Sequence, residues 1–484
     1  MIYDNAYYMD IFGVSVPLLE QLCREALHSG GDYCDLFFEN TSYRDLLLRD
    51  GEVTSGGFHV DFGAGIRVLS GEKTGYAYTE NTDAASLKAA ARAAAAISDG
   101  ITPIAPVMDD GGRVGRKIYK GVPNPAADRY PILQDWRECG ADTLVPVLER
   151  LKEKVTARES RVIKVIAMLS SQVSDILMFN SFGELKYDTR PMGTLAVSVV
   201  FSDGKSVQNN HVSRSFRMGA EMLDEALLDT LAAEAVRNLD DRFAASRPKG
   251  GKMPVVMGAG ASGILLHEAM GHAFEADFNR KGQSIFSDKL GKQICSDKIT
   301  IVDDGTLRGN RGALNFDDEG VPASRTCMVE EGRLTSYLHD RISARFYGVA
   351  PTGNGRRESF RYNPIPRMRA TYMEGGDANP ADIIASVRKG IFVDEFSNGQ
   401  VKIGEGDFTF YVKSGYLIEN GRLTQPVKDI NIIGNGPQAL ADIVAVGSDA
   451  KIDNGAWTCG KEQSVPVSCG IPTVLVNNLI VGGD

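Results

Sequence analysis

The chain has 484 residues, of which 43% are hydrophobic and 24% are charged, a composition typical of a folded globular protein. This length predicts two or three domains, because a single hydrophobic core rarely extends beyond about 300 residues. Lys and Arg number 53 against 63 Asp and Glu, and the resulting net charge of -10 argues against direct contact with a nucleic-acid backbone.

Several features bear on where the protein works. The uncharged stretch ahead of His267 is much shorter than the roughly 20 apolar residues that span a bilayer. Asp4 and Asp10 interrupt the apolar residues of the N-terminus, which has no basic segment of the kind that begins a secretory signal. The seven cysteines form no C-x-x-C pair, as is usual in a reducing compartment. We therefore expect a cytoplasmic protein without a membrane segment.

The first part of the chain predicts an α+β unit over residues 1–105. A helix is expected at residues 17–28, and residues 34–79 alternate apolar and polar side chains between glycines, as in short antiparallel strands. The alanine-dense residues 83–98 predict a second helix, for which Asn81 and Thr82 can supply the N-cap. Prolines and glycines then recur so densely that we predict a linker at residues 106–131.

A second α+β unit is expected at residues 132–246. It contains a predicted helix at 133–157, strands at 162–169, 176–182 and 194–201, and a helix that ends near residue 238. The stretch RPKGGKMP marks the next boundary, and residues 247–484 contain many short strands with few helices. The predicted fold class is thus α+β, with an N-terminal α/β sandwich-like region followed by a mostly antiparallel β domain at residues 247–484.

The most informative stretch is LLHEAMGHAFEADF, in which His267 and His272 stand five residues apart and Glu268 follows the first histidine. Residues five apart point about 140° away from each other on a regular α-helix, so they could not easily bind one ion. A π-type turn would bring both onto one face, and Gly271 lowers the cost of irregular backbone there. Two imidazoles beside a glutamate favour zinc, with Glu268 as general base for a metal-activated water. A buried helix with two hydrogen-bonded histidines is the alternative.

A metal site of this kind needs a third ligand, and several residues qualify. Glu275 and Asp277 follow on the same segment, although either can be a solvated carboxylate, and His339 stands among polar residues typical of a surface or hydrogen-bonded histidine. Cys459 and Cys469 lie in glycine-flanked loops, where a thiolate could reach a metal or remain a buried free thiol. The residue pattern alone does not choose among them.

Several separated stretches resemble the TldD/PmbA family, specifically its metal-bearing TldD-like branch. They are GAGIRVLSGEKTGYAYT, LLHEAMGHAFEADFNRKG, DDGTLRGNRGALNFDDEGVPASRT, PTGNGRRESFRYNPIPRMRATYM and the run from VKIGEGDF to VNNLIVGG. The resemblance implies a zinc metallopeptidase that cleaves short or unfolded peptides. It further implies a Zn²⁺ ion held by His267, His272 and Cys459, with Glu268 as the catalytic base and Cys469 outside the site.

The resemblance also bears on partners and on rival functions. It implies a homodimer or a heteromer with a PmbA-like homologue, and an extended peptide paired with a sheet edge near the zinc. The family's older name, modulator of DNA gyrase, suggests instead a non-catalytic regulatory protein. Another hydrolysis, such as deacylation, is a third possibility. The basic residues between Arg356 and Arg369 could hold a substrate carboxylate, but pairing with the acidic residues of the DDEG-type loops is the stronger expectation.

Overall fold

A computed structural model describes residues 4–98, 128–130, 132–260, 262–402 and 405–482. The predicted linker at residues 106–131 lies outside these ranges except for residues 128–130 and cannot be compared with the prediction. The predicted α+β class is confirmed, since helices pack against several mostly antiparallel sheets. No helix among the described residues has the length and apolar character needed to cross a membrane.

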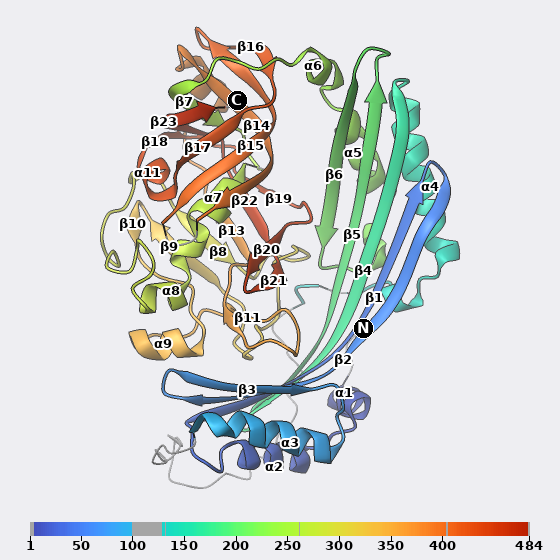
Figure 1. The fold of residues 1–484 in the computed structure, drawn as a ribbon, viewed down its shortest axis with the longest axis vertical. Coiled ribbons are helices and arrows are strands. Elements are labelled where there is room, and N and C mark those ends of the chain that lie inside the picture. Colours follow the sequence, from blue (N-terminus) through green and yellow to red (C-terminus); the bar gives the residue numbers. More distant parts are fainter. Residues whose placement is uncertain (1–3, 99–127, 131, 261, 403–404, 483–484) are drawn as a thin grey trace.

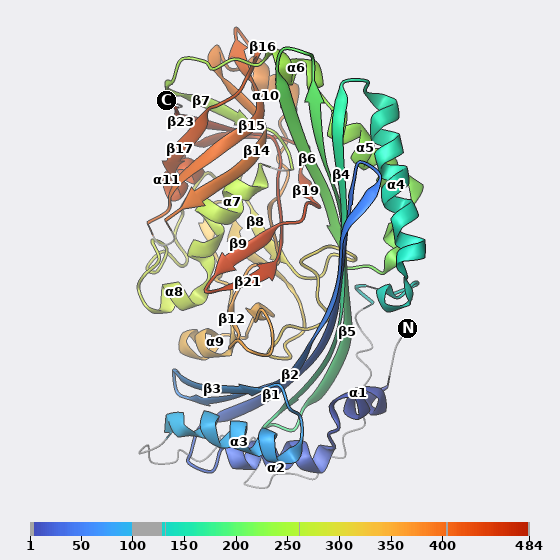
Figure 2. The ribbon, with the colours of Figure 1, turned by 45° about the vertical axis from the view of Figure 1, so that its right-hand side comes forward.

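The N-terminal half is built on one long, curved antiparallel sheet that bends around the rest of the molecule (Figures 1 and 2). Its strands follow the order β3-β2-β1-β4-β5-β6. Their bounds are β1 Tyr33–Arg49, β2 Glu52–Ser70, β3 Lys73–Thr79, β4 Val162–Asn180, β5 Leu185–Ser202 and β6 Val207–Phe216. Because β1 pairs with β4 along most of its length, the two N-terminal units expected from the sequence share this sheet. Their exact chain boundaries stay a prediction.

Two groups of helices cover the convex side of this sheet, and each encloses its own apolar core. Around one end lie α1 Asn5–Phe12, α2 Val16–Ala26, α3 Ala84–Ala95 and the 3₁₀ turn η1 Ala96–Ser98. Around the other lie α4 Ala141–Arg158, α5 Glu225–Val236, α6 Leu239–Ala244 and the 3₁₀ turns η2 Trp136–Glu138 and η3 Ala220–Met222.

The predicted elements differ from the observed ones at particular residues. The N-cap of α3 is Asp83, whose carboxylate accepts hydrogen bonds from the Ala85 and Ser86 amides, so the prediction that Asn81 or Thr82 caps this helix was wrong. Helix α4 begins at Ala141, eight residues later than expected, because Gly140 stands before it as N-cap. The two strands predicted at residues 162–169 and 176–182 belong to one continuous strand, β4.

Strand β4 continues through polar residues because the neighbouring strand satisfies them. The Ser174 hydroxyl donates to the Thr41 hydroxyl of β1 (2.8 Å), whose own proton goes to Glu39, and both residues are buried. A run of Ser and Gln reads locally as a turn, but here it lies in the middle of a sheet. Strand β6 was not predicted at all, since its sequence is mostly polar.

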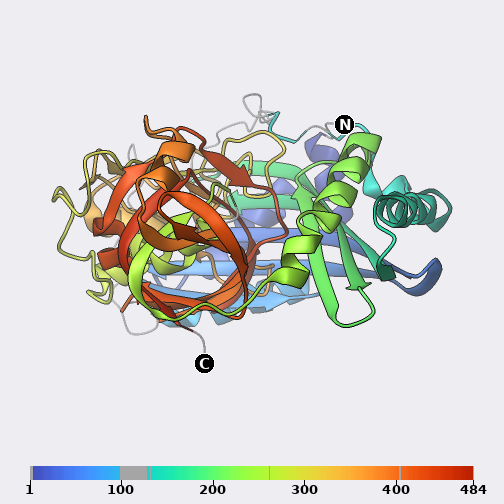
Figure 3. The ribbon, with the colours of Figure 1, turned by 90° about the horizontal axis from the view of Figure 1, so that it is seen from above.

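The C-terminal half contains a closed barrel, shown in orange and red in Figure 3 beside the curved sheet. Its order β14-β7-β23-β17-β15 closes because β14 also pairs with β15, and β16 and β18 extend it. The bounds are β7 Gly251–Met257, β14 Lys389–Val401, β15 Asp407–Glu419, β16 Arg422–Val427, β17 Asn431–Asn435, β18 Ile443–Val446 and β23 Val474–Gly482.

A second sheet packs beside the barrel with the order β10-β9-β8-β13-β22-β19. Its strands are β8 Ile301–Asp304, β9 Arg325–Glu330, β10 Arg333–Leu334, β13 Ala370–Met373, β19 Lys451–Asp453 and β22 Ser468–Ile471. Two small hairpins join β11 Gly355–Arg356 to β12 Ile365–Pro366 and β20 Thr458–Lys461 to β21 Gln463–Pro466. The helices of this half are α7 Gly263–Ala269, the 3₁₀ turn η4 Gly271–Phe274, α8 Ala276–Arg280, α9 Arg341–Tyr347, α10 Pro380–Ala385 and α11 Gly436–Ala441.

Helix α7 carries the histidine motif and lies between the barrel and the second sheet, in contact with strands of both. Its apolar residues Leu265 and Leu266 are buried in the largest core of the protein. At its first turn, a Cβ atom on Gly263 would lie 2.5 Å from the backbone nitrogen of Gly470 on β22. Only a glycine allows the helix to approach the strand this closely, so this contact fixes where the motif stands.

Buried charges join the curved sheet to the C-terminal half. Arg67 of β2 donates to Asp35 through Nε (2.8 Å) and to Glu319 through Nη1 (2.6 Å), and all three side chains are buried. Glu39 of β1 accepts hydrogen bonds from the Phe360 amide (2.8 Å) and from the Thr41 hydroxyl. The long sheet is therefore a docking surface for the half that carries the motif.

The variant Gly263→Ala should lower the melting temperature. The added methyl group meets backbone atoms that cannot rotate away, and overpacking of this kind costs about 1–3 kcal/mol. Thermal unfolding followed by circular dichroism measures the effect. Gly57→Ala on β2, where a Cβ atom would meet nothing within 4 Å, is the control. A Gly263→Ala variant as heat-stable as the parent would contradict the close packing of α7.

Glu39 should make the docking of the two halves weaker as pH rises. Burial raises the pKa of Glu39 from 4.5 to about 7, although hydrogen bonds from Thr41 and Phe360 oppose the shift. The folded chain thus keeps a proton that the unfolded chain releases between these values, and stability declines as pH rises through that window. We expect the melting temperature of Glu39→Gln, relative to that of the parent, to rise between about pH 5 and about pH 8. Parallel curves for the two proteins would refute this role of Glu39.

Candidate metal centre

The histidine motif spans a break in the helix. Helix α7 ends at Ala269, Met270 has φ -129° and ψ -38°, and the 3₁₀ turn η4 begins at Gly271. The π-type turn expected from the spacing is therefore wrong for this segment, because a change of helix type at Met270 provides the rotation instead. As a result the rings of His267 and His272 face each other, with centroids 5.5 Å apart and planes at 76°.

Gly271 has a different role from the one expected. Its backbone does not need a left-handed conformation, but a Cβ atom at this position would lie 2.2 Å from the Met368 sulfur. Met368 is fully buried against the motif and leaves no space for a side chain there. Gly271 thus permits close packing beneath the second histidine.

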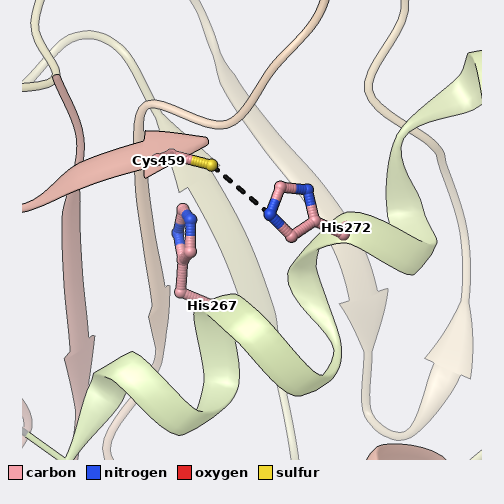
Figure 4. A group of neighbouring side chains, drawn as sticks. All are labelled: His267, His272 and Cys459. Atoms are coloured by element: carbon pink, nitrogen blue, oxygen red, sulfur yellow. Dashed lines mark hydrogen bonds between the residues drawn. The ribbon is translucent and has the colours of Figure 1, made fainter. Parts of the chain in front are cut away.

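Cys459 completes a cluster of three buried donors, which Figure 4 shows in isolation. Its sulfur lies 3.4 Å from Nε2 of His272 and comes from strand β20, which faces the helix break. One donor atom from each of His267, His272 and Cys459 lies within 4.8 Å of the other two. In a tetrahedral zinc site with ordinary Zn–S and Zn–N bond lengths, sulfur and nitrogen are roughly 3.5 Å apart.

The state of His267 provides a test of whether these residues fit a metal. Its side chain is 1% exposed, yet neither ring nitrogen has a hydrogen-bond partner among the described residues. A buried polar group without a partner is costly, and a structural histidine would be expected to have one. Two imidazoles and a thiolate are ligands that Zn²⁺ prefers, so the donor set fits that ion.

The surroundings of Cys459 favour its thiolate form. Burial opposes ionisation of the Cys459 thiol, but the adjacent imidazoles of His267 and His272 outweigh it and lower its pKa to about 4. The thiolate is the form that binds metals.

The other proposed ligands lie outside this cluster. Glu275 Oε2 is 2.9 Å from Nδ1 of His272, so the carboxylate stands behind the histidine and away from the sulfur. Asp277 accepts a hydrogen bond from Lys461. His339 is buried rather than on the surface, with Nδ1 3.3 Å from the Ser343 hydroxyl, and burial lowers its pKa to about 4.

Cys469 lies on β22 and burial raises the pKa of its thiol well above the usual value, with further contributions from Asp453 and Glu268. A neutral thiol is a poor ligand, which agrees with its place outside the group of three donors.

Glu268 lies at the edge of the cluster. Its side chain is 26% exposed, and Oε2 is 3.9 Å from Nε2 of His272, the nitrogen that faces the sulfur. The carboxylate can therefore reach both the donor cluster and solvent, as a residue that transfers protons must.

Lys461, which lies near the cluster, was not singled out from the sequence, and Arg367 was expected only as one of the basic residues that could hold a carboxylate. Lys461 donates hydrogen bonds to Glu275 and Asp277, and Arg367 donates to the carbonyl oxygen of Cys459. The spacing of Cys459 and Lys461 was the available signal, since residues two apart on a strand share a face. Both side chains are buried while their neighbours on β20 are exposed.

The arginines between residues 356 and 369 are mostly interior. Arg356, Arg367 and Arg369 donate to main-chain carbonyl groups, and Arg357 donates to the Asp318 carbonyl group while its amide binds the Asp318 carboxylate. Arg361 alone pairs with acids near the surface, at Asp61 and Glu80. Among the described residues, the expected ion pairs with DDEG-type acids are thus not formed by these arginines: the Arg357 guanidinium pairs with Asp35 (3.5 Å), and Arg357 reaches the Asp318 carboxylate only through its backbone amide.

A cleft of about 580 Å³ separates the outer edge of the curved sheet from the barrel. Strand β6, the last of its sheet, forms one wall, and β14, β15 and the segment from Lys451 to Trp457 form others. Trp457 is two residues from Cys459, so the cleft ends close to the strand that carries the sulfur.

Family comparisons agree with this arrangement of domains. The chain matches the PmbA/TldA metallopeptidase domain 1 over residues 34–98, the central domain over 135–242 and the C-terminal domain over 250–483. A metalloprotease TldD homologue from Haemophilus influenzae is 38% identical over 462 residues, which cover 94% of each chain. A metalloprotease TldD homologue from Buchnera aphidicola is 36% identical and covers 96% of this chain and 95% of its own.

A solved structure from Thermotoga maritima, described as a candidate modulator of DNA gyrase, shares the fold with a TM-score of 0.74. It is 22% identical and covers 96% of this chain and 99% of its own. The comparisons place the chain among proteins named as metallopeptidases. It belongs to the TldD/PmbA family, as its motifs indicated.

Removal of any one of the three donors should abolish stoichiometric metal binding. We expect the parent to bind about one Zn²⁺ per chain, and His267→Ala, His272→Ala and Cys459→Ala to bind far less, because three protein ligands define such a site. Equilibrium dialysis followed by elemental analysis measures this. Cys469→Ala, which removes a buried thiol outside the cluster, is the control. Full binding by Cys459→Ala would exclude sulfur as a ligand.

Proposed function

We propose that this protein is a zinc-dependent peptidase that cleaves short or unfolded peptides in the cytoplasm. His267, His272 and Cys459 hold one Zn²⁺ ion, and Glu268 is the catalytic base. When bound, the ion supplies a Lewis acid that lowers the pKa of water towards about 7 and polarises a carbonyl group. The names of the relatives support a metal-dependent protease, and the donor set supports zinc as the metal.

The observation that carries this proposal is the unpartnered state of His267 within a group of three converging donors. A non-catalytic regulator with a structural motif would need hydrogen-bonded imidazoles at these positions. The relative described as a candidate gyrase modulator shares the fold, and a shared fold does not define an activity.

Glu268 performs the proton transfers in this proposal. Its exposed position lets the carboxylate accept a proton from the attacking water and deliver it to the nitrogen of the leaving amine. Glu275 accepts a hydrogen bond from Nδ1 of His272, and its negative charge would balance the positive charge of a cation bound at Nε2.

The cleft supports a peptide as substrate. Its wall includes β6, the last strand of the curved sheet, whose outer edge is occupied at Ser215 by Asn454 and at His211 by Lys413 but pairs with no further strand among the described residues. An edge strand binds extended chains through backbone hydrogen bonds with little dependence on side chains. A folded protein does not present such a chain, so an extended peptide or an unfolded segment fits best. No nucleic acid or membrane enters this proposal.

We further propose that the chain works in an oligomer, either as a homodimer or with a PmbA-like homologue. A cytoplasmic peptidase has to keep folded proteins away from its catalytic centre, and an enclosed assembly would do so.

Glu268→Gln should keep the metal and lose the activity. The substitution preserves size but removes the basic carboxylate, and loss of a general base slows cleavage by about 10²–10⁴-fold. Incubation with an unfolded protein and mass spectrometry of the products reports new internal termini, while elemental analysis reports the metal. Glu149→Gln, at an exposed position on α4, is the control.

The outcomes separate the rival functions. Cleavage by Glu268→Gln at the rate of the parent means that the base is misassigned. A metal-loaded parent that yields no internal termini but removes acyl groups favours a deacylase, and a parent that binds no metal favours a regulator.

A further inference from the structure

Lys461 reaches the centre from the same strand as the sulfur ligand. Along β20 the side chains of Cys459 and Lys461 are buried, whereas the residues Thr458 and Gly460 are exposed, so the two buried groups share one face. The Lys461 ammonium donates to Glu275 Oε2 (3.0 Å), to Asp277 Oδ1 (2.8 Å) and to the Pro366 carbonyl oxygen (3.3 Å). Its side chain is 2% exposed, so these contacts replace its hydration.

Glu275 connects this lysine to the second imidazole. Oε2 of Glu275 lies within hydrogen-bond distance of both the Lys461 ammonium and Nδ1 of His272, and the side chain is fully buried. When His272 is neutral, donation from Nδ1 leaves the lone pair on Nε2, the atom that faces the Cys459 sulfur. The buried carboxylate thus fixes the orientation of the ring and selects the neutral tautomer that can bind a cation.

Arg367 makes a second bridge between the same segments. It donates to the carbonyl oxygens of Cys459 (2.6 Å) and Gln463 (2.8 Å) on the β20–β21 hairpin, and its Nε lies 3.8 Å from Glu275 Oε1. The guanidinium is fully buried. Two cations, one on the hairpin and one beside it, therefore converge on the carboxylate that orients His272.

We propose that Lys461, Glu275 and Arg367 form a positioning unit that sets the distance between Cys459 Sγ and His272 Nε2. The unit ties the strand that carries the sulfur to the turn that carries the nitrogen, and it keeps both donors pointing at one cation. None of the three residues contacts the cation. This inference rests on the proposed metal centre and adds to it the residues that hold its geometry.

Lys461→Met tests the unit, because methionine has a similar length and no charge. Loss of a partner behind a ligand commonly weakens metal binding by about 10–100-fold, and we expect this range for zinc, measured by competition with a chromophoric chelator. With Co²⁺ in place of zinc, the thiolate-to-metal absorption of the parent should weaken or shift. Zinc affinity and a cobalt spectrum equal to those of the parent would overturn the proposal.

Lys154→Met is the matched control. Lys154 also bridges two carboxylates, those of Glu225 and Asp229, but on the surface of α4 and α5. This variant should bind metal as the parent does. Thermal unfolding of both variants separates a general loss of stability from an effect at the centre.

Combination with Glu275→Gln keeps the proposal testable if Lys461→Met does not fold, because the double variant leaves no unpaired charge on Glu275. The double variant is then compared with Glu275→Gln alone. Residues that act as one unit are not additive, so the two should bind zinc equally, whereas a further loss in the double variant means that Lys461 acts independently of Glu275 and contradicts the unit. A parent that binds no stoichiometric zinc refutes the proposed function itself, whereas a zinc-binding parent with an unaffected Lys461→Met variant refutes only this inference.

Discussion

The convergence of three buried donors from distant parts of the chain is the constraint on which the rest of the structure depends. Cys459 and His272 are separated by 187 residues, and their donor atoms lie 3.4 Å apart in the interior. Donors this far apart in sequence meet only because the packing of helix α7, the β20–β21 hairpin and the two neighbouring sheets holds them together. The close contacts at Gly263 and Gly271 belong to this requirement, since each brings the motif against a neighbour with no side chain between them.

The sequence predicted the motif well because its information is local. Two histidines and a glutamate within six residues define a chemistry, and the chain does bring His267 and His272 together. The form of the backbone between them was not predictable. A π-type turn and a break into a 3₁₀ turn can each turn two histidines five residues apart towards each other. Packing of Met368 against Gly271, nearly a hundred residues away, accompanies the break. The sulfur donor was likewise beyond local reasoning, and only resemblance to a family selected Cys459.

The same distinction explains the fold. Helices with regular apolar spacing and strands between glycines were found from the pattern, whereas the single sheet of the N-terminal half depends on pairing between Asp35 and Asn180 and their neighbours. The arginines after residue 355 were harder still. Segments without regular secondary structure leave carbonyl oxygens unpaired, and a buried guanidinium can satisfy several of them at once. Most arginines of this basic stretch, which resembles an anion-binding surface in the sequence, are therefore buried and stabilise the interior.

Arg67 and Glu319 are 252 residues apart, yet each neutralises the other inside the protein. One belongs to the curved sheet and the other to the half with the donor cluster, so the electrostatic balance of the interior is divided between the two. A substitution at either position would leave the charge of the other buried without this partner, which is strongly destabilising. The curved sheet and the half with the donor cluster therefore depend on each other for stability, and neither is an interchangeable module.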